Sequence, residues 1–337
     1  MRSAGFGLIG CGVWGEVHAR TYAASPSAHL VAVFDRDQER GSRFAREFGA
    51  QTSYADLHDL LADPDIEAVA VATPDFAHTE AVLAALQAGK HVLVEKPLAM
   101  TVDDCKQILA ARDANGVKLM VDFHNRWLNP FVHVRRMIES GELGSLLMIN
   151  IRLNDTLYVP TKMLSWAANS PPLHFLGSHV VDLVRWLSGA EVERVFSVSR
   201  SVVQQGLGID TPDFYQSILE LSNGRTAVIE NCWIIAESAP NIFDLKGEFV
   251  GTKGSAFVDV SHHRMIEKYT QEGPALLDAL RSLDQHGNPL GSAAIEHFID
   301  SVVRDTAPTA TGEDGLEATR IVEAMEISAR SGHPVNL

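Results

Sequence analysis

Short apolar segments alternate with amphipathic helical patterns along the first third of the chain. The strand-like segments are rich in Val, Ile and Leu without polar alternation: Gly5–Ile9, Leu30–Phe34, Ala68–Val71, Val92–Val94 and Lys118–Val121. Such continuous apolar strands are expected where helices cover both faces of a parallel sheet. Between the last two strands, Thr101 with Asp104 is typical of a helix N-terminus, and Gly116 of its end. The pattern predicts an α/β domain with a doubly wound parallel sheet, the Rossmann architecture.

Strand candidates follow one another without intervening helices in the later part of the chain. They are Leu146–Leu153, Val192–Val203, Phe214–Leu221, Arg225–Ile234, Ile242–Phe249 and Ser255–Val260. The Asn223-Gly224 dipeptide predicts a two-residue hairpin turn, and strands joined by tight turns are antiparallel. We therefore expect an α+β part with a largely antiparallel sheet of about six strands and helices against one face.

Two helical patterns and one loop pattern complete this second part. Helices are expected over about Leu173–Leu187 and about Glu313–Arg330, where apolar residues recur at helical spacing. The stretch Gln271–Ser292 mixes Gly, Pro, Asn and Asp with apolar residues and predicts a long loop. The sequence is thus divided into two expected domains, residues 1–124 and 125–337.

The charge balance narrows the partners that we expect. The 337 residues include 28 Lys and Arg against 43 Asp and Glu, a formal net charge of −15. Nucleic acids and anionic membranes are bound mainly through Lys and Arg, so neither is expected as a partner. The chain starts directly on a strand pattern, with no room for a signal peptide, and its three cysteines lie far apart in sequence. These features predict a cytoplasmic protein.

A glycine-rich segment separates the first strand from the first helix. Gly10-Cys11-Gly12-Val13-Trp14-Gly15 has the spacing G-x-G-x-x-G. In a dinucleotide site, Gly10 permits a tight turn, Gly12 lets the backbone approach a pyrophosphate, and Gly15 lets the helix pack on the strand. Asp35, 20 residues beyond Gly15, is placed to accept hydrogen bonds from an adenosine ribose. The alternative is a structural turn that binds nothing.

Three further features bear on the choice and placement of a cofactor. The carboxylate of Asp35 favours NAD, because it repels the 2′-phosphate of NADP. Arg36 keeps NADP open, since it could meet that phosphate, stack on adenine or stay in solvent. Thr73 and Pro74 follow the third strand at the carboxyl edge of the sheet, where ligands bind in open α/β sheets, although a simple turn explains them equally well.

Chemically useful side chains follow the fourth and fifth strands. In Glu95-Lys96-Pro97, the proline restricts the residue before it to extended geometry and so fixes the direction of Lys96. From the residues alone, a surface lysine is still open. Asn125 could reach a nicotinamide, Arg126 could reach a polar substrate, and Trp166 could stack on a sugar. For each residue taken singly, a place in the core or on the surface is the more common role. Neither H-E-x-x-H nor clustered cysteines occur, so no metal site is predicted.

Taken together, the motifs resemble those of the Gfo/Idh/MocA family, named for glucose–fructose oxidoreductase, inositol dehydrogenase and rhizopine catabolism. The resemblance covers nearly the whole chain and rests on Gly10–Gly15, Ala72-Thr73-Pro74 followed by His78, Glu95-Lys96-Pro97, and Gly177–Asp182 leading into Arg185-Trp186-Leu187. It implies an NAD(P)-binding Rossmann domain and a domain for substrate binding and oligomerisation. The implied activity is the oxidation or reduction of sugars, polyols and inositols. The implied assembly is a homodimer or homotetramer formed through the open face of the sheet.

The resemblance also implies the roles of individual residues. The lysine at the position of Lys96 binds the reacting hydroxyl, and the histidine at the position of His179 acts as acid and base. Hydride transfer between NAD and a secondary alcohol or ketone is then the expected reaction. The expected cofactor site further includes Val13, Trp14, His78 and Glu95.

One departure from the family pattern concerns the residues before His179. An aspartate usually stands four residues before this histidine, and here that position holds Phe175. His174 could take over as a substrate-binding residue. On an α-helix, however, His174 and His179 would be about 140° apart around the axis.

Two other functions are therefore kept open. Loss of the aspartate is compatible with glycoside cleavage by transient oxidation, elimination and re-reduction, which yields product without net NADH. A regulator that only senses the dinucleotide is the third possibility. Intact Lys96 and His179 argue against a sensor, because sensing needs no machinery for moving protons.

Overall fold

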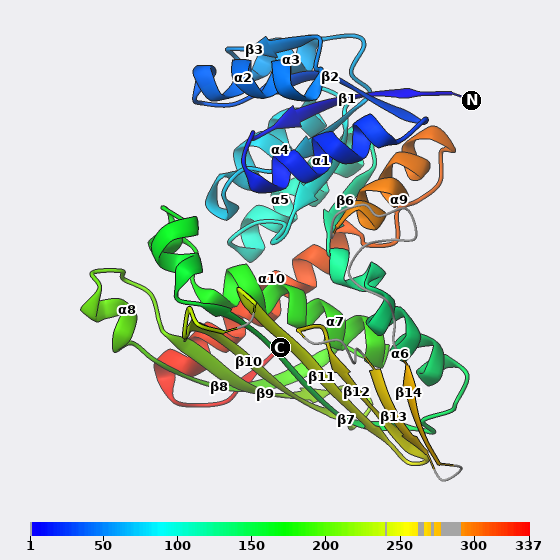
Figure 1. Cartoon of the computed structure of the whole chain (residues 1–337), viewed down its shortest axis with the longest axis vertical. Coiled ribbons are helices and arrows are strands. Elements are labelled where there is room, and N and C mark those ends of the chain that lie inside the picture. Colours follow the sequence, from blue (N-terminus) through cyan, green and yellow to red (C-terminus); the bar gives the residue numbers. More distant parts are fainter. Residues whose placement is uncertain (1, 240, 262–265, 271–272, 278–290) are drawn as a thin grey trace. The chain divides into compact units, whose positions relative to one another are not determined.

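The computed structural model describes residues 2–239, 241–261, 266–270, 273–277 and 291–337 (Figure 1). The chain divides into two compact units. The first contains residues 1–124 and 283–317, and the second contains residues 125–282 and 318–337. The first unit therefore takes in a late segment that the division by sequence placed in the second half.

A six-stranded parallel sheet forms the centre of the first unit, with the order β3-β2-β1-β4-β5-β6. Its strands are β1 (Ala4–Ile9), β2 (Ala28–Phe34), β3 (Thr52–Tyr54), β4 (Ala68–Val71), β5 (His91–Glu95) and β6 (Leu119–Asp122). The helices are α1 (Val13–Ala24), α2 (Gln38–Phe48), α3 (Leu57–Ala62), η1 (Asp75–Ala77), α4 (His78–Gln87), α5 (Val102–Asn115) and α9 (Ser292–Val303). The predicted Rossmann architecture is confirmed, and β1 and β4 flank the point where the strand order reverses.

Local sequence signals explain where these elements begin and end. The side chain of Thr101 accepts a hydrogen bond from the N–H of Asp104 and caps α5, which ends at Gly116 with a φ of 62°. Strand β3 carries no apolar run, which is why the hydrophobic pattern did not reveal it. The late segment joins this unit through apolar contacts, such as the edge-to-face packing of Phe298 in α9 on Phe6 in β1, with ring centroids 6.3 Å apart.

A nine-stranded sheet dominates the second unit, in the order β14-β13-β12-β11-β7-β10-β9-β8-β15. The strands are β7 (Leu146–Thr156), β8 (Val192–Arg200), β9 (Phe214–Leu221), β10 (Thr226–Ile235), β11 (Phe243–Gly251), β12 (Gly254–Asp259), β13 (Ile266–Thr270), β14 (Gly273–Leu277) and β15 (Val335–Asn336). All neighbours pair antiparallel except β7 and β10, which are parallel. The predicted antiparallel character is confirmed, with three strands more than expected.

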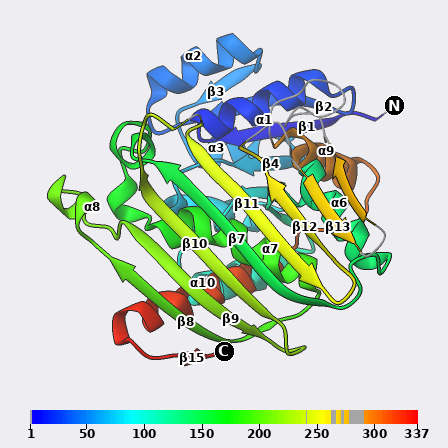
Figure 2. The ribbon, with the colours of Figure 1, turned by 60° about the horizontal axis from the view of Figure 1, so that its bottom comes forward.

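Helices α7 (Ser178–Ser188) and α10 (Gly312–Ser331) lie on one side of this sheet, as Figure 2 shows. The helices of the second unit are η2 (His124–Trp127), α6 (Asn129–Glu139), α7, α8 (Val203–Gly206) and α10. The first residue of η2 and the first six residues of α10 belong to the first unit. Short π and 3-10 turns (η3, Val159–Met163; η4, Ala167–Asn169; η5, Leu173–Gly177) precede α7.

Two predictions about loops in this unit can be compared with the structure. The turn at Asn223-Gly224 joins β9 to β10, and Gly224 has the φ of 74° that the hairpin needs. Of the expected loop Gln271–Ser292, residues 273–277 form β14 and Ser292 starts α9, while residues 271–272 and 278–290 lie outside the described residues.

The opposite face of the sheet carries a row of apolar side chains. Phe196, Ile218 and Val228 are direct neighbours on β8, β9 and β10. Their exposed fractions are 37%, 48% and 43%. Polar residues would be expected on a strand face left to solvent.

Candidate functional site

The glycine-rich turn after β1 has the geometry that a dinucleotide site needs. Gly10 has a φ of 101°, and a Cβ there would lie 2.5 Å from the carbonyl oxygen of Ala72. A Cβ on Gly15 would lie 2.3 Å from the carbonyl oxygen of Gly10. A Cβ on Gly12 meets nothing within 4 Å, and its φ is −91°. The protein therefore needs Gly10 and Gly15 for its own packing, whereas a Cβ on Gly12, at the N-terminus of α1, would enter open space. The predicted approach of a pyrophosphate to Gly12 requires such space.

Asp35 directly follows β2 beside this turn, and its carboxylate already has hydrogen-bond partners within the protein. Its carboxylate accepts hydrogen bonds from the backbone N–H groups of Cys11 and Asp37, both at 2.9 Å. Arg40 donates to both oxygens, from Nε at 3.0 Å and from Nη2 at 2.6 Å. Burial opposes ionisation, but these donors outweigh it and hold the pKa of Asp35 below its usual value. Arg36 is exposed.

The two apolar residues of the motif lie at the start of α1. Val13 is 63% exposed, which is unusual for a valine beside a buried strand end. Trp14 stacks on the imidazole of His124, with ring centroids 4.8 Å apart and an angle of 27° between the planes. An apolar surface in front of the glycine turn is therefore preformed within the first unit.

The segment after β4 is held by a buried histidine. Thr73 and Pro74 are half-buried, and His78 has no exposed surface. The ring of His78 places Nδ1 2.7 Å from the carbonyl oxygen of Pro97 and Nε2 3.0 Å from that of Thr73. Burial lowers its pKa. His78 thus connects the segments after β4 and β5 through the carbonyl groups of Thr73 and Pro97. Its contact with the cofactor stays a prediction.

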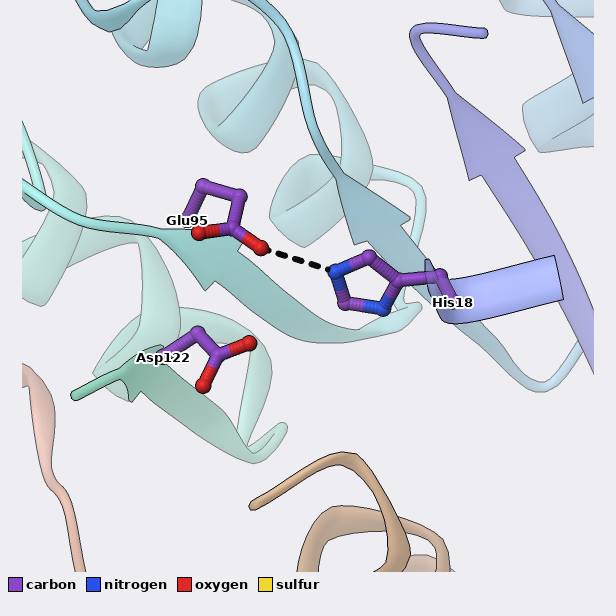
Figure 3. A group of neighbouring side chains, drawn as sticks. All are labelled: His18, Glu95 and Asp122. Atoms are coloured by element: carbon purple, nitrogen blue, oxygen red, sulfur yellow. Dashed lines mark hydrogen bonds and ion pairs between the residues drawn. The ribbon is translucent and has the colours of Figure 1, made fainter. Parts of the chain in front are cut away.

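Lys96 directly follows β5 and is buried, which excludes the surface lysine left open by the sequence. Glu95, the residue before Lys96, forms a hydrogen bond with His18 of α1, and Glu95 Oε1 lies 3.0 Å from His18 Nε2. Asp122, at the end of β6, pairs in register with Glu95. Lys96 thus lies next to a buried group of ionisable side chains drawn in Figure 3.

In the second unit, the expected substrate residue Arg126 is paired with an acid. Its Nε donates to Asp182 Oδ2 at 2.8 Å, its Nη2 reaches the other oxygen, and both side chains are buried. A bidentate pair of this kind fixes η2 against α7. Asp182 thus holds the guanidinium through two of its nitrogens, and Asn125 beside Arg126 is also buried. The substrate contact of Arg126 stays a prediction.

Phe175, which occupies the usual aspartate position, belongs to an aromatic cluster. Its ring centroid lies 6.0 Å from that of Trp166 and 5.7 Å from that of Trp233. Trp233 is fully buried and donates from Nε1 to Asp155 Oδ2 at 3.2 Å. The expected sugar-stacking residue Trp166 thus packs edge-on against Phe175.

A single π-helical turn, Leu173–Gly177, precedes α7. The N–H of Ser178 donates to the carbonyl of Leu173, and Ser178 Oγ donates to the carbonyl of His174 at 2.8 Å. A π turn spreads one helical turn over an additional residue. The separation of about 140° expected on an α-helix therefore does not apply to His174 and His179, because the residues between them include this π turn.

Both histidines are buried in the second unit. His174 Nδ1 lies 3.5 Å from Oε1 of Glu326 on α10. A carboxylate is therefore present next to His174, although the sequence position four residues before His179 holds none.

The sequence reasoning missed four residues of these sites: Arg40, His18, Asp122 and Glu326. Arg40 follows Asp35 by five residues and could have been found as a charge near the ribose position. The other three meet their partners across large distances in sequence, such as the 77 residues between His18 and Glu95. No local pattern contains such contacts.

Comparison with known proteins agrees with this geometry. Residues 4–123 match a family model described as "Oxidoreductase family, NAD-binding Rossmann fold", and residues 131–257 match the GFO/IDH/MocA C-terminal domain. Inositol 2-dehydrogenase from Acidothermus cellulolyticus is 31% identical to this chain. The alignment covers 98% of this chain and 94% of that protein. Inositol 2-dehydrogenase 1 from Saccharopolyspora erythraea is 30% identical, with 98% and 95% covered.

Solved structures share the fold across the whole chain. An oxidoreductase from Agrobacterium radiobacter, in complex with NAD+, L-tartaric acid and magnesium, has a TM-score of 0.90 at 24% identity, with 99% of this chain and 98% of that chain covered. The scyllo-inositol dehydrogenase from Lactobacillus casei, with bound NAD(H) and scyllo-inositol, has a TM-score of 0.84 at 19% identity, with 99% of both chains covered.

The first unit is thus an NAD-binding Rossmann domain, and the protein is an oxidoreductase by class. More specifically, the chain belongs to the Gfo/Idh/MocA family, as its motifs indicated.

Proposed function

We propose that this enzyme transfers a hydride between NAD and a secondary alcohol of an inositol or a related polyol or sugar. The observation that carries the proposal is that Gly12 and Lys96 both lie at the carboxyl edge of the first sheet. There, the open space at Gly12 follows β1 and the buried Lys96 follows β5. A dinucleotide and a hydrogen-bond donor for an alkoxide meet at such an edge. The inositol dehydrogenases among the relatives support the substrate class.

The chain's own residues would act as follows in the oxidation direction. His179 takes the proton of the substrate hydroxyl, and Lys96 donates a hydrogen bond to the oxygen as it gains negative charge. Bound NAD supplies the hydride acceptor. We further propose that His174, with the carboxylate of Glu326, takes over the orientation of the substrate that the aspartate commonly provides.

The test is a panel of inositols, polyols and sugars assayed for NADH formation. Lys96→Met should lower kcat for the best substrate at least about 100-fold, the lower end expected for a group acting on the reacting proton. Lys106→Met on the exposed face of α5 is the matched control and should behave as wild type. A Lys96→Met enzyme with wild-type kcat would refute the role of this lysine.

Two outcomes of the same panel favour the other functions. Product formation from a glycoside without net NADH would indicate cleavage by transient oxidation. Tight NAD binding without turnover of any compound would indicate a sensor. The buried Lys96 favours an enzyme over a sensor, because sensing needs no group that moves or donates a proton to a substrate.

We also propose that the protein forms homodimers or homotetramers through the open face of its second sheet. The apolar row of Phe196, Ile218 and Val228 supports this assembly, because exposed apolar residues in register are rare on a free sheet face. Ile218→Glu should reduce the mass measured by light scattering to that of a monomer. Val202→Glu, at an exposed valine near α8, should leave the mass unchanged.

A cytoplasmic location is part of the same proposal. Cys11, Cys105 and Cys232 are free thiols, which fits a reducing compartment. Among the described residues, every helix is too short or too polar to cross a membrane.

A further inference from the structure

Three ionisable side chains meet inside the first unit, where strands β5 and β6 end against α1. Figure 3 shows His18, Glu95 and Asp122 directed toward one another. One polar atom from each lies within 4.8 Å of the others, and all three side chains are buried. Glu95 and Asp122 are register partners on adjacent parallel strands, so their side chains leave the sheet on the same face.

The hydrogen bonding of this group is incomplete. Glu95 Oε1 lies 3.0 Å from His18 Nε2. Glu95 Oε2 and both carboxylate oxygens of Asp122 are buried and accept no hydrogen bond from a donor group among the described residues. The two carboxyl groups lie close enough to hydrogen-bond to each other once one of them carries a proton. Two ionised carboxylates so close together in a dry interior would repel each other and lose their hydration. A proton held by the pair removes the repulsion and supplies the missing hydrogen-bond donor.

The surrounding groups favour protonation of the carboxyls over protonation of the histidines. Burial lowers the pKa of His18 to about 4 and that of His124 to about 3. Burial raises the pKa of Glu95 to about 7, opposed by the charge of Lys96. Burial and the charge of Glu95 raise the pKa of Asp122 well above its usual value. These opposite directions favour a proton on the carboxyl pair over a proton on either histidine.

The remaining polar groups around the pair do not replace this proton. His124 Nδ1 lies 4.0 Å from Asp122 Oδ1, beyond hydrogen-bonding distance. The hydroxyl of Tyr22 faces His18 Nδ1 at 3.5 Å, on the far side of the ring from Glu95. Asp75 adds a further negative charge near Glu95, and Lys96 is the cation whose charge acts on Glu95 and Asp122.

We propose that Glu95 and Asp122, with neutral His18, form a buried proton-exchange site that sets the charge next to Lys96. With one proton, the pair carries one negative charge and stabilises the Lys96 ammonium as a hydrogen-bond donor. With a second proton, taken from solvent onto Glu95, the pair is neutral and no longer contributes negative charge beside Lys96. His18, Glu95 and Asp122 are then positioning residues for Lys96. The mechanistic part of this inference rests on the proposed function.

The first test needs no turnover. Infrared spectra of the apo protein at neutral pH should contain the C=O stretch of a protonated carboxyl. Asp122→Asn should remove this band. The matched control is Asp213→Asn, because Asp213 is a buried carboxylate that three backbone N–H groups keep ionised. A wild-type spectrum without the band, or a band that survives Asp122→Asn, overturns the proposal whatever the enzyme's activity.

A bound cation would be the competing occupant, and the same sample tests it. Titration of the apo protein with Zn²⁺ alone should leave the band in place. If Zn²⁺ removes the band from the wild-type spectrum, and if protons are released from wild type but not from Asp122→Asn, the group is a cation site. The proton-exchange proposal is then wrong.

The second test reads the pH dependence of turnover. As the pH falls, protonation of His179 and of Glu95 should both reduce kcat/KM, so its logarithm should fall with a limiting slope of two. In Glu95→Gln the slope should fall to one and the plateau should drop about tenfold, as expected for loss of a nearby counter-charge. A slope of two in Glu95→Gln would exclude Glu95 as the second group. Loss of activity at all pH values with the infrared band intact would instead count against the proposed reaction.

Discussion

The open space at Gly12 leads to a prediction that separates cofactor binding from folding. We consider Gly12→Ser. Gly12 is the N-cap of α1, its φ of −91° suits any residue, and a Cβ there contacts nothing within 4 Å. Serine is at least as good an N-cap as glycine. The free energy of unfolding should therefore change by less than about 0.5 kcal/mol.

The same side chain would occupy the space that the pyrophosphate needs. We expect NAD to bind at least about tenfold more weakly, a loss of about 1.4 kcal/mol. Gly10→Ala provides the contrast. Its φ of 101° costs an L-residue about 1–2 kcal/mol, and the Cβ lies 2.5 Å from the carbonyl oxygen of Ala72. That overlap adds about 1–3 kcal/mol.

Thermal unfolding and calorimetric NAD titration together measure both effects. Gly12→Ser should have a Tm within about 2 °C of wild type, whereas Gly10→Ala should lose roughly 5–15 °C. If Gly12→Ser folds normally and binds NAD with wild-type affinity, the pyrophosphate does not lie against this turn, and the argument from the glycine geometry fails.

Four further predictions follow from individual contacts. Asp35→Ser should raise the affinity for NADP relative to NAD at least about tenfold, because Arg40 is then released to meet a 2′-phosphate; unchanged relative affinities in calorimetry would contradict this. Asp182→Ala should lower the free energy of unfolding by about 3–5 kcal/mol, since it leaves the guanidinium of Arg126 buried without its carboxylate, and denaturant unfolding measures the loss. Phe175→Asp should cost about 3 kcal/mol or more through lost aromatic packing and should not raise kcat; a stable, faster variant would contradict the packing role. Because the pKa of Asp213 is lowered in the folded protein, its contribution to stability is present above its usual pKa and is lost as the pH falls below about 4, so the Tm of Asp213→Asn should depend less on acid pH than that of wild type.

Much of the fold was predictable because its signals are local. Buried parallel strands require continuous apolar runs, and helix ends require particular residues, so elements such as β4 and α5 were recognised from their sequence. The strand β3 was not, since its sequence Thr52-Ser53-Tyr54 is polar and its pairing with β2 is long-range. Strand β14 was interpreted as a loop because glycine and proline begin it.

The candidate site was predictable to the extent that each residue lies in a motif. The glycine turn, Asp35 and Lys96 were found in this way. The partners of those residues were not, because Asp122 meets Glu95 only when the two strands pair. The angle of about 140° expected between His174 and His179 holds only for an α-helix. The chain forms a π turn over Leu173–Gly177, so that expectation was wrong.

The return of the chain to the first unit has a consequence for the order of synthesis. Phe6 packs against Phe298, and Met120 forms a β-bridge with Thr311, so the NAD-binding unit is built from two segments of the chain. Most of the second unit lies between these segments in the sequence. A ribosome that has made only residues 1–124 has made every strand of the parallel sheet and the glycine turn, but not α9. The nascent Rossmann unit must therefore wait, with an apolar surface uncovered, until about 180 further residues have been added, because α9 is made only after strands β7 to β14 of the second sheet.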